Sequence, residues 1–437
     1  MSSEGEGMQH NTHLSQRARH VVESPISGLM RRALEDPRLI SLAAGFVDQT
    51  SLPVEAARSA ALAALSEPEA ARAALQYGST AGHPGLRRQV LAHVLAQDAA
   101  ASGGGHVGGP VPDDEQIILT AGSNQILTLL ADALLDPGDH VLCDAPTYFV
   151  FTGLVQSVGA QCVGVASDEG GMRIDALERT LADYAARGEL ARVKAIYVMS
   201  YFDNPRGISL ARERRAALVA LAERYSREQR IYVIEDAAYR ELRFEGDDLP
   251  SLRSLDVQGQ SVIYAGTFSK SFSPGVRVGY GIFPRELGRI VLALKGYQDF
   301  GSPHFNQCLV SSAFSLGLYA PHVALLRDVY KRKAECTVRA LDAELKPLGI
   351  GRYQRPMGGL YVWLELPTHI DTGPSGVLFA RALELGVLYV PGEYCFPDGA
   401  QRAGSSARAS LRLSFGAQSD ARIAEGVALL ARAISQL

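Results

Sequence analysis

SVIYAGTFSKSFSPGVRVGYGIFP, residues 261–284, contains two apolar runs joined by a polar turn. The runs at 261–268 and 276–284 predict two strands, and their apolar residues are continuous rather than alternating. Continuous apolar strands are typical of a sheet that is covered on both faces. Lys270 follows the first strand directly, so its amine is expected at the carboxyl end of a buried strand.

Similar apolar runs precede this segment, and helical or turn patterns separate most of them. Residues 116–121 predict a strand, and residues 124–135 predict an amphipathic helix. This alternation predicts an α/β domain built on a doubly wound, mostly parallel sheet. Further strands of the same sheet are expected at 140–144, 162–166, 195–200 and 231–236.

The pattern changes after about residue 305, where a long helical repeat covers 320–346. Short strands and helices follow it and predict a smaller α+β domain. The N-terminal segment is expected to pack beside this domain, which makes the small domain discontinuous. We therefore expect a disordered polar tail over 1–20, a large domain over 46–318, and a small domain formed by 21–45 with 319–437.

The composition excludes several classes of protein. The chain of 437 residues has 43 basic and 47 acidic side chains, a net charge of −4 that suits neither nucleic acid nor an anionic membrane. It contains no run of eighteen apolar residues and no apolar signal segment near its start. The five cysteines lack C-x-x-C spacing, which favours reduced thiols, a cytoplasmic location and no metal site.

Only six of the basic residues are lysines, so a reaction that needs an amine has few candidates. Lys270 alone lies at a strand's carboxyl end, where open α/β sheets bind ligands. A lysine becomes nucleophilic when it is desolvated or lies near another cation, and Arg277 is a candidate for that cation or for a phosphate ligand. Three other lysines fall in helical patterns, where a solvated side chain is the simplest interpretation: Lys295, Lys331 and Lys333.

Three further strand ends carry groups of complementary chemistry. IYVIED ends in Asp236, whose buried carboxylate would need a cationic partner such as a pyridinium nitrogen, and Tyr239 follows on the same loop. In LTAGSNQ, residues 119–125, Gly122 and Ser123 stand at a helix N-terminus, where an anion such as phosphate is favoured. Tyr148 follows the next strand, where its ring could stack on a flat ligand.

A lysine, an acidic partner, an anion site and a stacking aromatic ring are what pyridoxal phosphate requires. GTFSKSFSPGVRVGY, residues 266–280, resembles the pyridoxal-phosphate lysine signature of class I/II aminotransferases, which belong to the aspartate-aminotransferase-like, fold type I superfamily. The resemblance extends from about residue 25 to the end of the chain. It implies a fold type I enzyme with pyridoxal 5'-phosphate as cofactor.

The resemblance also implies roles for single residues. Lys270 resembles the internal aldimine lysine that moves the proton between the substrate Cα and the cofactor carbon. Asp236 resembles the partner of the pyridinium nitrogen, and Tyr239 and Asn204 resemble the residues that bind the cofactor's 3-oxygen. Tyr148 resembles the ring-stacking aromatic residue and joins Lys270 and Asp236 in the expected catalytic set.

Further residues are matched to the phosphate, the substrate and the subunit interface. Arg412 in SLRLSF and Gly45 in ISLAAGF resemble the residues that bind the substrate α-carboxylate, a site that Asn204 is expected to share. Tyr77 in QYGSTAGHPGLR resembles the tyrosine that reaches the phosphate of a neighbouring subunit, which implies a homodimer. The phosphate itself is expected to be bound by Gly122, Ser123, Asn124, Thr267, Ser269 and Arg277.

Two segments depart from the family pattern. SYFDNPRG replaces the usual P-x-x-Q-N-P-T-G, so that Asp203 and Arg206 stand in place of Gln and Thr. Asp48 and Gln49 occupy an N-terminal loop where a more apolar turn is expected. Asp203 and Asp48 either favour a substrate with a cationic far end or reflect neutral drift on loops.

The leading hypothesis is a cytoplasmic aminotransferase of amino acid metabolism that acts on an α-amino acid through Lys270. The alternative is a pyridoxal-phosphate enzyme of specialised metabolism that catalyses β- or γ-elimination, replacement, oxidation, or ring formation as in aminocyclopropane-carboxylate-synthase-like enzymes. A transcriptional sensor of this fold would need a basic helix-turn-helix segment, for which residues 1–25 are too short. A nucleotide-binding protein is disfavoured because neither Gly-rich phosphate motif follows the first strand.

Overall fold

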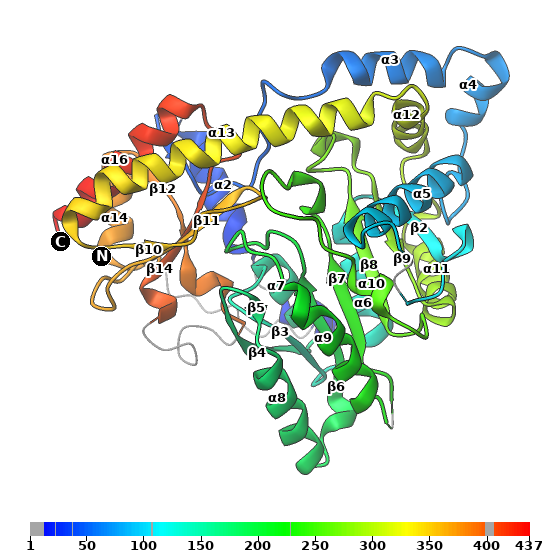
Figure 1. Ribbon diagram of the computed structural model, residues 1–437, viewed down its shortest axis with the longest axis horizontal. Helices are drawn as coiled ribbons and strands as arrows, with labels where there is room; N and C mark the ends of the chain where they lie inside the picture. Colours follow the sequence, from blue (N-terminus) through cyan, green and yellow to red (C-terminus); the bar gives the residue numbers. More distant parts are fainter. Residues whose placement is uncertain (1–12, 22, 37, 106–107, 228, 398–405) are drawn as a thin grey trace.

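The computed structural model describes residues 13–21, 23–36, 38–105, 108–227, 229–397 and 406–437 (Figure 1). Most of the tail expected to be disordered, residues 1–12, lies outside the described residues. The end of that tail differs from the expectation, because Gln16–His20 form the short helix α1. Arg17 of this helix pairs with Asp132 at 2.6 Å, which holds α1 against the large sheet's helices.

The larger sheet confirms the predicted α/β fold. β3, β4, β6, β7 and β8 run parallel to one another, whereas β9 is antiparallel to both β2 and β8, and β5 is antiparallel to β4. In spatial order the eight strands are β2 (Ile117–Thr120), β9 (Gly279–Ile282), β8 (Val262–Thr267), β7 (Tyr232–Asp236), β6 (Val193–Met199), β3 (His140–Ala145), β4 (Gln161–Asp168) and β5 (Gly171–Met172).

Both faces of this sheet are buried, as the continuous apolar strands predict. In β6, Ile196 and Val198 pack into one core while Ala195 and Tyr197 pack into the other, because successive side chains point to opposite faces. The first core is closed by α8 (Ile174–Ala186), α9 (Arg212–Tyr225) and α10 (Leu252–Leu255). The second includes side chains of α5 (Pro84–Ala101), α6 (Ser123–Leu134), α7 (Phe149–Ser157), α11 (Arg285–Asp299) and α12 (His304–Ser315).

A second, antiparallel sheet is formed by the C-terminal part of the chain. Its order is β10 (Arg352–Tyr353), β11 (Tyr361–Glu365), β14 (Ser410–Ser414) and β13 (Val390–Pro391). Figure 1 shows the long helix α13 (Tyr319–Leu345), in yellow, running from α12 toward this sheet. Two further C-terminal helices are α14 (Val377–Leu385) and α16 (Asp420–Ser435).

The N-terminal segment is joined to the C-terminal part through a short parallel pair. β1 (Ile40–Ser41) hydrogen-bonds with β12 (Val387–Leu388), so the loop after β1 is anchored near the second sheet. The helices of this N-terminal region are α2 (Pro25–Glu35), α3 (Val54–Ala64) and α4 (Pro68–Ala74).

Among the residues that the structure describes, no single helix combines the length and the apolar character that a bilayer crossing requires. One pair bent by 88°, His304–Ser315 with Tyr319–Leu348, meets the length and composition requirement when both parts are taken together.

Candidate active site

The carboxyl ends of β7 and β8 bring Asp236 and Lys270 to one edge of the large sheet. The Nζ of Lys270 donates to the carbonyl oxygen of Gly45 at 2.8 Å. Burial lowers the pKa of Lys270, and the cationic Arg412 and Arg277 lower it further against an opposing effect of Tyr361. The amine is therefore more readily neutral, which is the nucleophilic form.

Asp236 ends β7 and is buried, with 2% of its surface exposed. Tyr197 on the neighbouring strand β6 donates to its Oδ2 at 2.9 Å, and the backbone nitrogen of Ala238 donates to its Oδ1 at 3.1 Å. Burial raises the pKa of Asp236 to about 6 despite these hydrogen bonds. Among the described side chains no cation pairs with this carboxylate, so the site suits a ligand that brings a positive charge.

The first turn of α6 has the backbone features of an anion site. Gly122 precedes the helix with φ +82°, a left-handed conformation that favours glycine, and no side chain caps the helix. β9 lies so close that a Cβ on Gly279 would be 2.6 Å from the backbone nitrogen of Ser123. Backbone N–H groups of a first turn have no partners within the helix and lie at its positive end, so they bind anions.

Arg277 places a guanidinium beside this turn. Its own φ is +48°, and its Nη2 donates to the carbonyl oxygen of Ala121 at 3.2 Å. Its Nη1 donates to the Oγ of Ser269 at 3.3 Å, and that hydroxyl lies 3.0 Å from the Oγ1 of Thr267. Asn124 is exposed in the first turn of α6. The structure therefore brings Gly122, Ser123, Thr267, Ser269 and Arg277 to one place, whereas no contact links the side chain of Asn124 to them among the described residues.

Arg412 on β14 is a second cation near Lys270, and its side chain is buried. Its Nη1 donates to the Oδ1 of Asn204 at 2.7 Å, and its Nη2 donates to the carbonyl oxygen of Ala43 at 2.5 Å. Its Nε is buried without a hydrogen-bond partner in the described part of the chain. A Cβ on Gly45 would overlap the hydroxyl of Tyr361, so backbone approaches closely here. A buried guanidinium with donor capacity left over suits a carboxylate.

The expected aromatic residues, Tyr148 and Tyr239, lie near the carboxylate of Asp236 and the guanidinium of Arg412. The hydroxyls of Tyr239 and Tyr361 are 2.9 Å apart, and the Arg412 guanidinium lies 4.4 Å from the centre of the Tyr361 ring. Tyr148 directly precedes α7, and burial raises the pKa of its phenol, with a further contribution from Tyr361 and Asp236.

Tyr77 is an expected site residue that lies far out on the surface of the single chain. Its side chain is 80% exposed and contacts Phe300 edge-on, with ring centroids 5.6 Å apart.

Two tyrosines of this site were missed in the sequence, Tyr197 and Tyr361. Both lie inside apolar strands, where a tyrosine is usually a core residue. The sequence shows where each tyrosine stands along its strand, β6 or β11, but the hydrogen-bond partner of each phenol comes from another part of the chain. No local pattern therefore identifies these two tyrosines as site residues.

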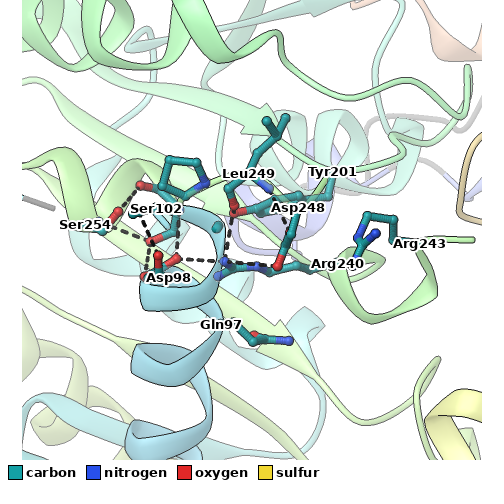
Figure 2. A network of polar contacts seen from close by, with 12 residues as sticks. Gln97, Asp98, Ser102, Tyr201, Arg240, Arg243, Asp248, Leu249 and Ser254 are labelled. Atoms are coloured by element: carbon teal, nitrogen blue, oxygen red, sulfur yellow. Dashed lines mark hydrogen bonds and ion pairs between the residues drawn. The ribbon is translucent and has the colours of Figure 1, made fainter. Parts of the chain in front are cut away.

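A buried ion pair between Asp98 and Arg240 supports the loop after β7 (Figure 2). Asp98 of α5 accepts from the Nη2 of Arg240 at 2.7 Å and from the backbone nitrogen and the hydroxyl of Ser251 at 2.9 and 2.7 Å. The guanidinium of Arg240 also lies 4.9 Å from the centre of the Tyr201 ring. Because Arg240 directly follows Tyr239, this network fixes the loop that carries Tyr239.

The residues that depart from the family pattern are paired inside the fold. Arg206 donates to Asp203 at 2.7 Å and to Asp144 at 3.1 Å, and Asp48 accepts from Lys333 at 2.6 Å. Neither Asp203 nor Asp48 is therefore left to bind a cationic substrate end. The simplest interpretation of the helical pattern, a solvated side chain, is wrong for Lys295 and Lys333, because both are buried.

The chain is similar to known proteins along nearly all its length. The family model "Aminotransferase class I and II" matches residues 37–430. The 2-aminoadipate transaminase of Thermus thermophilus is 34% identical over 404 residues, which cover 92% of this chain and 91% of that protein. The crystal structure of the multiple substrate aminotransferase of Thermococcus profundus has a TM-score of 0.86 at 30% identity, covering 97% of this chain and 98% of that one. LysN, the α-aminoadipate aminotransferase of Thermus thermophilus solved with N-(5'-phosphopyridoxyl)-L-leucine, has a TM-score of 0.82 at 32% identity, covering 98% and 99%.

Proposed function

The chain belongs to the class I and II aminotransferase family, and from that premise we propose how its residues carry out pyridoxal-phosphate-dependent transamination of an α-amino acid. It is a fold type I enzyme, and its relatives favour transamination over the elimination, replacement, oxidation and ring-forming outcomes. The observation that carries the assignment of roles is that Arg412 lies close enough to Lys270 to lower its pKa, while Asp236 ends the strand that pairs with β8, after which Lys270 follows.

The residues present fit the cofactor. Asp236 is a buried carboxylate without a described cationic partner, which suits the pyridine nitrogen. The uncapped first turn of α6 with Arg277, Ser269 and Thr267 suits the phosphate. Lys270 has a pKa lowered by burial and suits covalent attachment at the cofactor's carbonyl carbon.

When bound, pyridoxal phosphate supplies a protonated aromatic ring that withdraws electrons from the substrate Cα. The negative charge of Asp236 would stabilise the protonated ring nitrogen. The free amine of Lys270 would move a proton between the substrate Cα and the cofactor carbon. The ring of Tyr148 would lie against the cofactor ring and exclude water from that face.

Arg412 binds the substrate α-carboxylate through its guanidinium, with Gly45 allowing close approach of the backbone. Asn204 accepts a hydrogen bond from Arg412 through Oδ1, which leaves its amide nitrogen to donate to the cofactor's 3-oxygen beside Tyr239. A substrate held in this way would have its Cα–H bond directed toward Lys270, whose Nζ lies 2.8 Å from the carbonyl oxygen of Gly45.

We further propose a homodimer in which Tyr77 reaches the phosphate site of the partner subunit. Tyr77 is 80% exposed, and its neighbours Leu75 and Phe300 are 71% and 61% exposed, an apolar surface that association would bury. Arg277 is exposed on the single chain, so a partner's side chain has access to the phosphate ligands.

The division into domains and the cellular location complete the proposal. Residues 46–318 contain all eight strands of the larger sheet, and the pairing of β1 with β12 supports a small domain made of 21–45 with 319–437. All five cysteines are buried and none forms a disulfide, which supports a reducing, cytoplasmic location.

A single-turnover experiment tests the function. Enzyme reconstituted with pyridoxal phosphate is incubated with each member of a panel of α-amino acids, without a keto acid. We expect one equivalent of keto acid and one of pyridoxamine phosphate per active site. The absence of both products across the panel would contradict the proposal, and release of ammonia with the cofactor unchanged would indicate elimination instead.

A further inference from the structure

Lys333 of α13 is a buried ammonium group with a complete set of oxygen partners. Only 2% of its surface is exposed. Its Nζ donates to the Oδ1 of Asp48 at 2.6 Å, to the carbonyl oxygen of Gln418 at 2.6 Å and to that of Gly416 at 3.2 Å. An ammonium has three N–H donors, so each of them has a partner here. The three acceptors come from two segments that lie far apart in sequence.

Asp48 has further hydrogen-bond partners in its own loop and on α13. Its Oδ2 accepts from the hydroxyl of Thr50 at 2.6 Å and from the backbone nitrogen of Ser51 at 2.8 Å. The backbone nitrogen of Asp48 donates to the hydroxyl of Tyr330, also on α13, at 3.1 Å. Burial opposes ionisation of Asp48, but hydrogen bonds from Lys333 and Thr50 outweigh it and lower its pKa. The loop is therefore attached to α13 at two points one helical turn apart.

Each segment that Lys333 joins carries part of the proposed α-carboxylate site. On the loop before Asp48, the carbonyl oxygen of Ala43 accepts from Arg412 at 2.5 Å and that of Gly45 accepts from Lys270 at 2.8 Å. The second segment, which contains Gly416 and Gln418, directly follows the strand β14 that carries Arg412. The two segments touch, since a Cβ on Gly416 would overlap the carbonyl oxygen of Phe46.

We propose that Lys333 and Asp48 are positioning residues that hold the loop over 43–48 against the Arg412 strand and so set the geometry of the α-carboxylate site. This inference rests on the proposed function. Neither residue is placed to touch substrate or cofactor. They fix the distances from Arg412 to Ala43 and to Gly45. Binding of both the amino acid and the keto acid depends on these distances. The cofactor ligands on α6, β7 and β8 do not contact Lys333 or Asp48 through any described hydrogen bond.

The test uses Lys333→Met in the full-length enzyme reconstituted with pyridoxal phosphate. We expect KM to rise at least about tenfold for both the amino acid and the keto acid, with kcat and the Kd for pyridoxal phosphate each within about threefold of wild type. Lys346→Met is the matched control. Lys346 follows the same helix, and its ion pair with Asp342 at 2.8 Å is exposed, so its kinetics should equal those of wild type.

A second variant keeps the test decisive if Lys333→Met does not fold. Asp48→Asn with Lys333→Met removes both buried charges, which is better tolerated than leaving one of them unpaired. The double variant should keep the raised KM values and the unchanged cofactor affinity. If wild type is active, an unchanged KM in a folded variant would overturn the inference. A variant in which kcat and cofactor affinity fall together with the rise in KM would also overturn it. An inactive wild type would contradict the proposed function itself.

Discussion

Tyr197 donates its phenolic hydrogen to the Oδ2 of Asp236 at 2.9 Å, across two adjacent parallel strands. This hydrogen bond and the one from the backbone nitrogen of Ala238 give each carboxylate oxygen one donor. They orient the carboxylate without neutralising its charge, since a phenol and an amide are both uncharged donors. The charge of Asp236 is thus left to be balanced by the ring nitrogen of the cofactor.

Asp236→Asn should stabilise the cofactor-free protein at high pH. Folding raises the pKa of this carboxyl from 3.8 to about 6, so the folded state loses stability as pH rises through that interval. About two pKa units correspond to about 3 kcal/mol, the upper limit of the gain expected from the variant near pH 8. Urea unfolding of both proteins measures it. The gain should vanish near pH 4, and a gain independent of pH would contradict the assigned pKa.

Arg412→Lys should impair substrate binding much more than cofactor binding. A lysine cannot bind Asn204, Ala43 and a carboxylate at once, because it lacks the planar fork of arginine. We expect kcat/KM to fall about 100-fold or more, equally for amino acid and keto acid, with the cofactor absorbance unchanged. Steady-state kinetics with both substrates provides the measurement. A selective loss for one of the two would show that Arg412 does not bind their shared carboxylate.

Tyr77→Ala should weaken cofactor binding in spite of its exposed position. If the phenol reaches a partner's phosphate, its loss should raise the Kd for pyridoxal phosphate about tenfold and leave the free energy of unfolding nearly unchanged. Val257→Ala, at another exposed apolar side chain, is the control. Equilibrium dialysis gives the Kd, and sedimentation velocity gives the oligomeric state. A monomer with wild-type cofactor affinity would rule out the shared site.

Asp98→Ala should destabilise the protein strongly although Asp98 touches no proposed ligand site. It would leave Arg240 as a buried cation without its closest partner, at a cost of about 3–5 kcal/mol. Asp132→Ala removes an exposed partner of Arg17 and should cost no more than about 1 kcal/mol. Thermal unfolding of the three proteins compares them. Equal losses for the two variants would show that the network in Figure 2 does not anchor the Tyr239 loop.

The parts of the site that were predictable from residue patterns are those at strand ends. Asp236 ends one strand and Lys270 follows the next, and the carboxyl ends of parallel neighbours necessarily share one edge. Arg412 and Asn204 contact each other across 208 residues, so only a family resemblance could associate them. The prediction for Lys333 failed for a similar reason. Helical periodicity predicts a face but not a partner, and Asp48 lies 285 residues away.

The most direct test of the account is to identify the lysine that carries the cofactor. The enzyme is reconstituted with pyridoxal phosphate, reduced with borohydride, digested and analysed by mass spectrometry. We predict one phosphopyridoxyl group per chain, on Lys270, and none on Lys295 or Lys333, which are buried in ion pairs. Lys270→Ala should lack both this label and the visible absorbance band of wild type. A label on another lysine, or a reconstituted wild type without any label, would contradict the central claim.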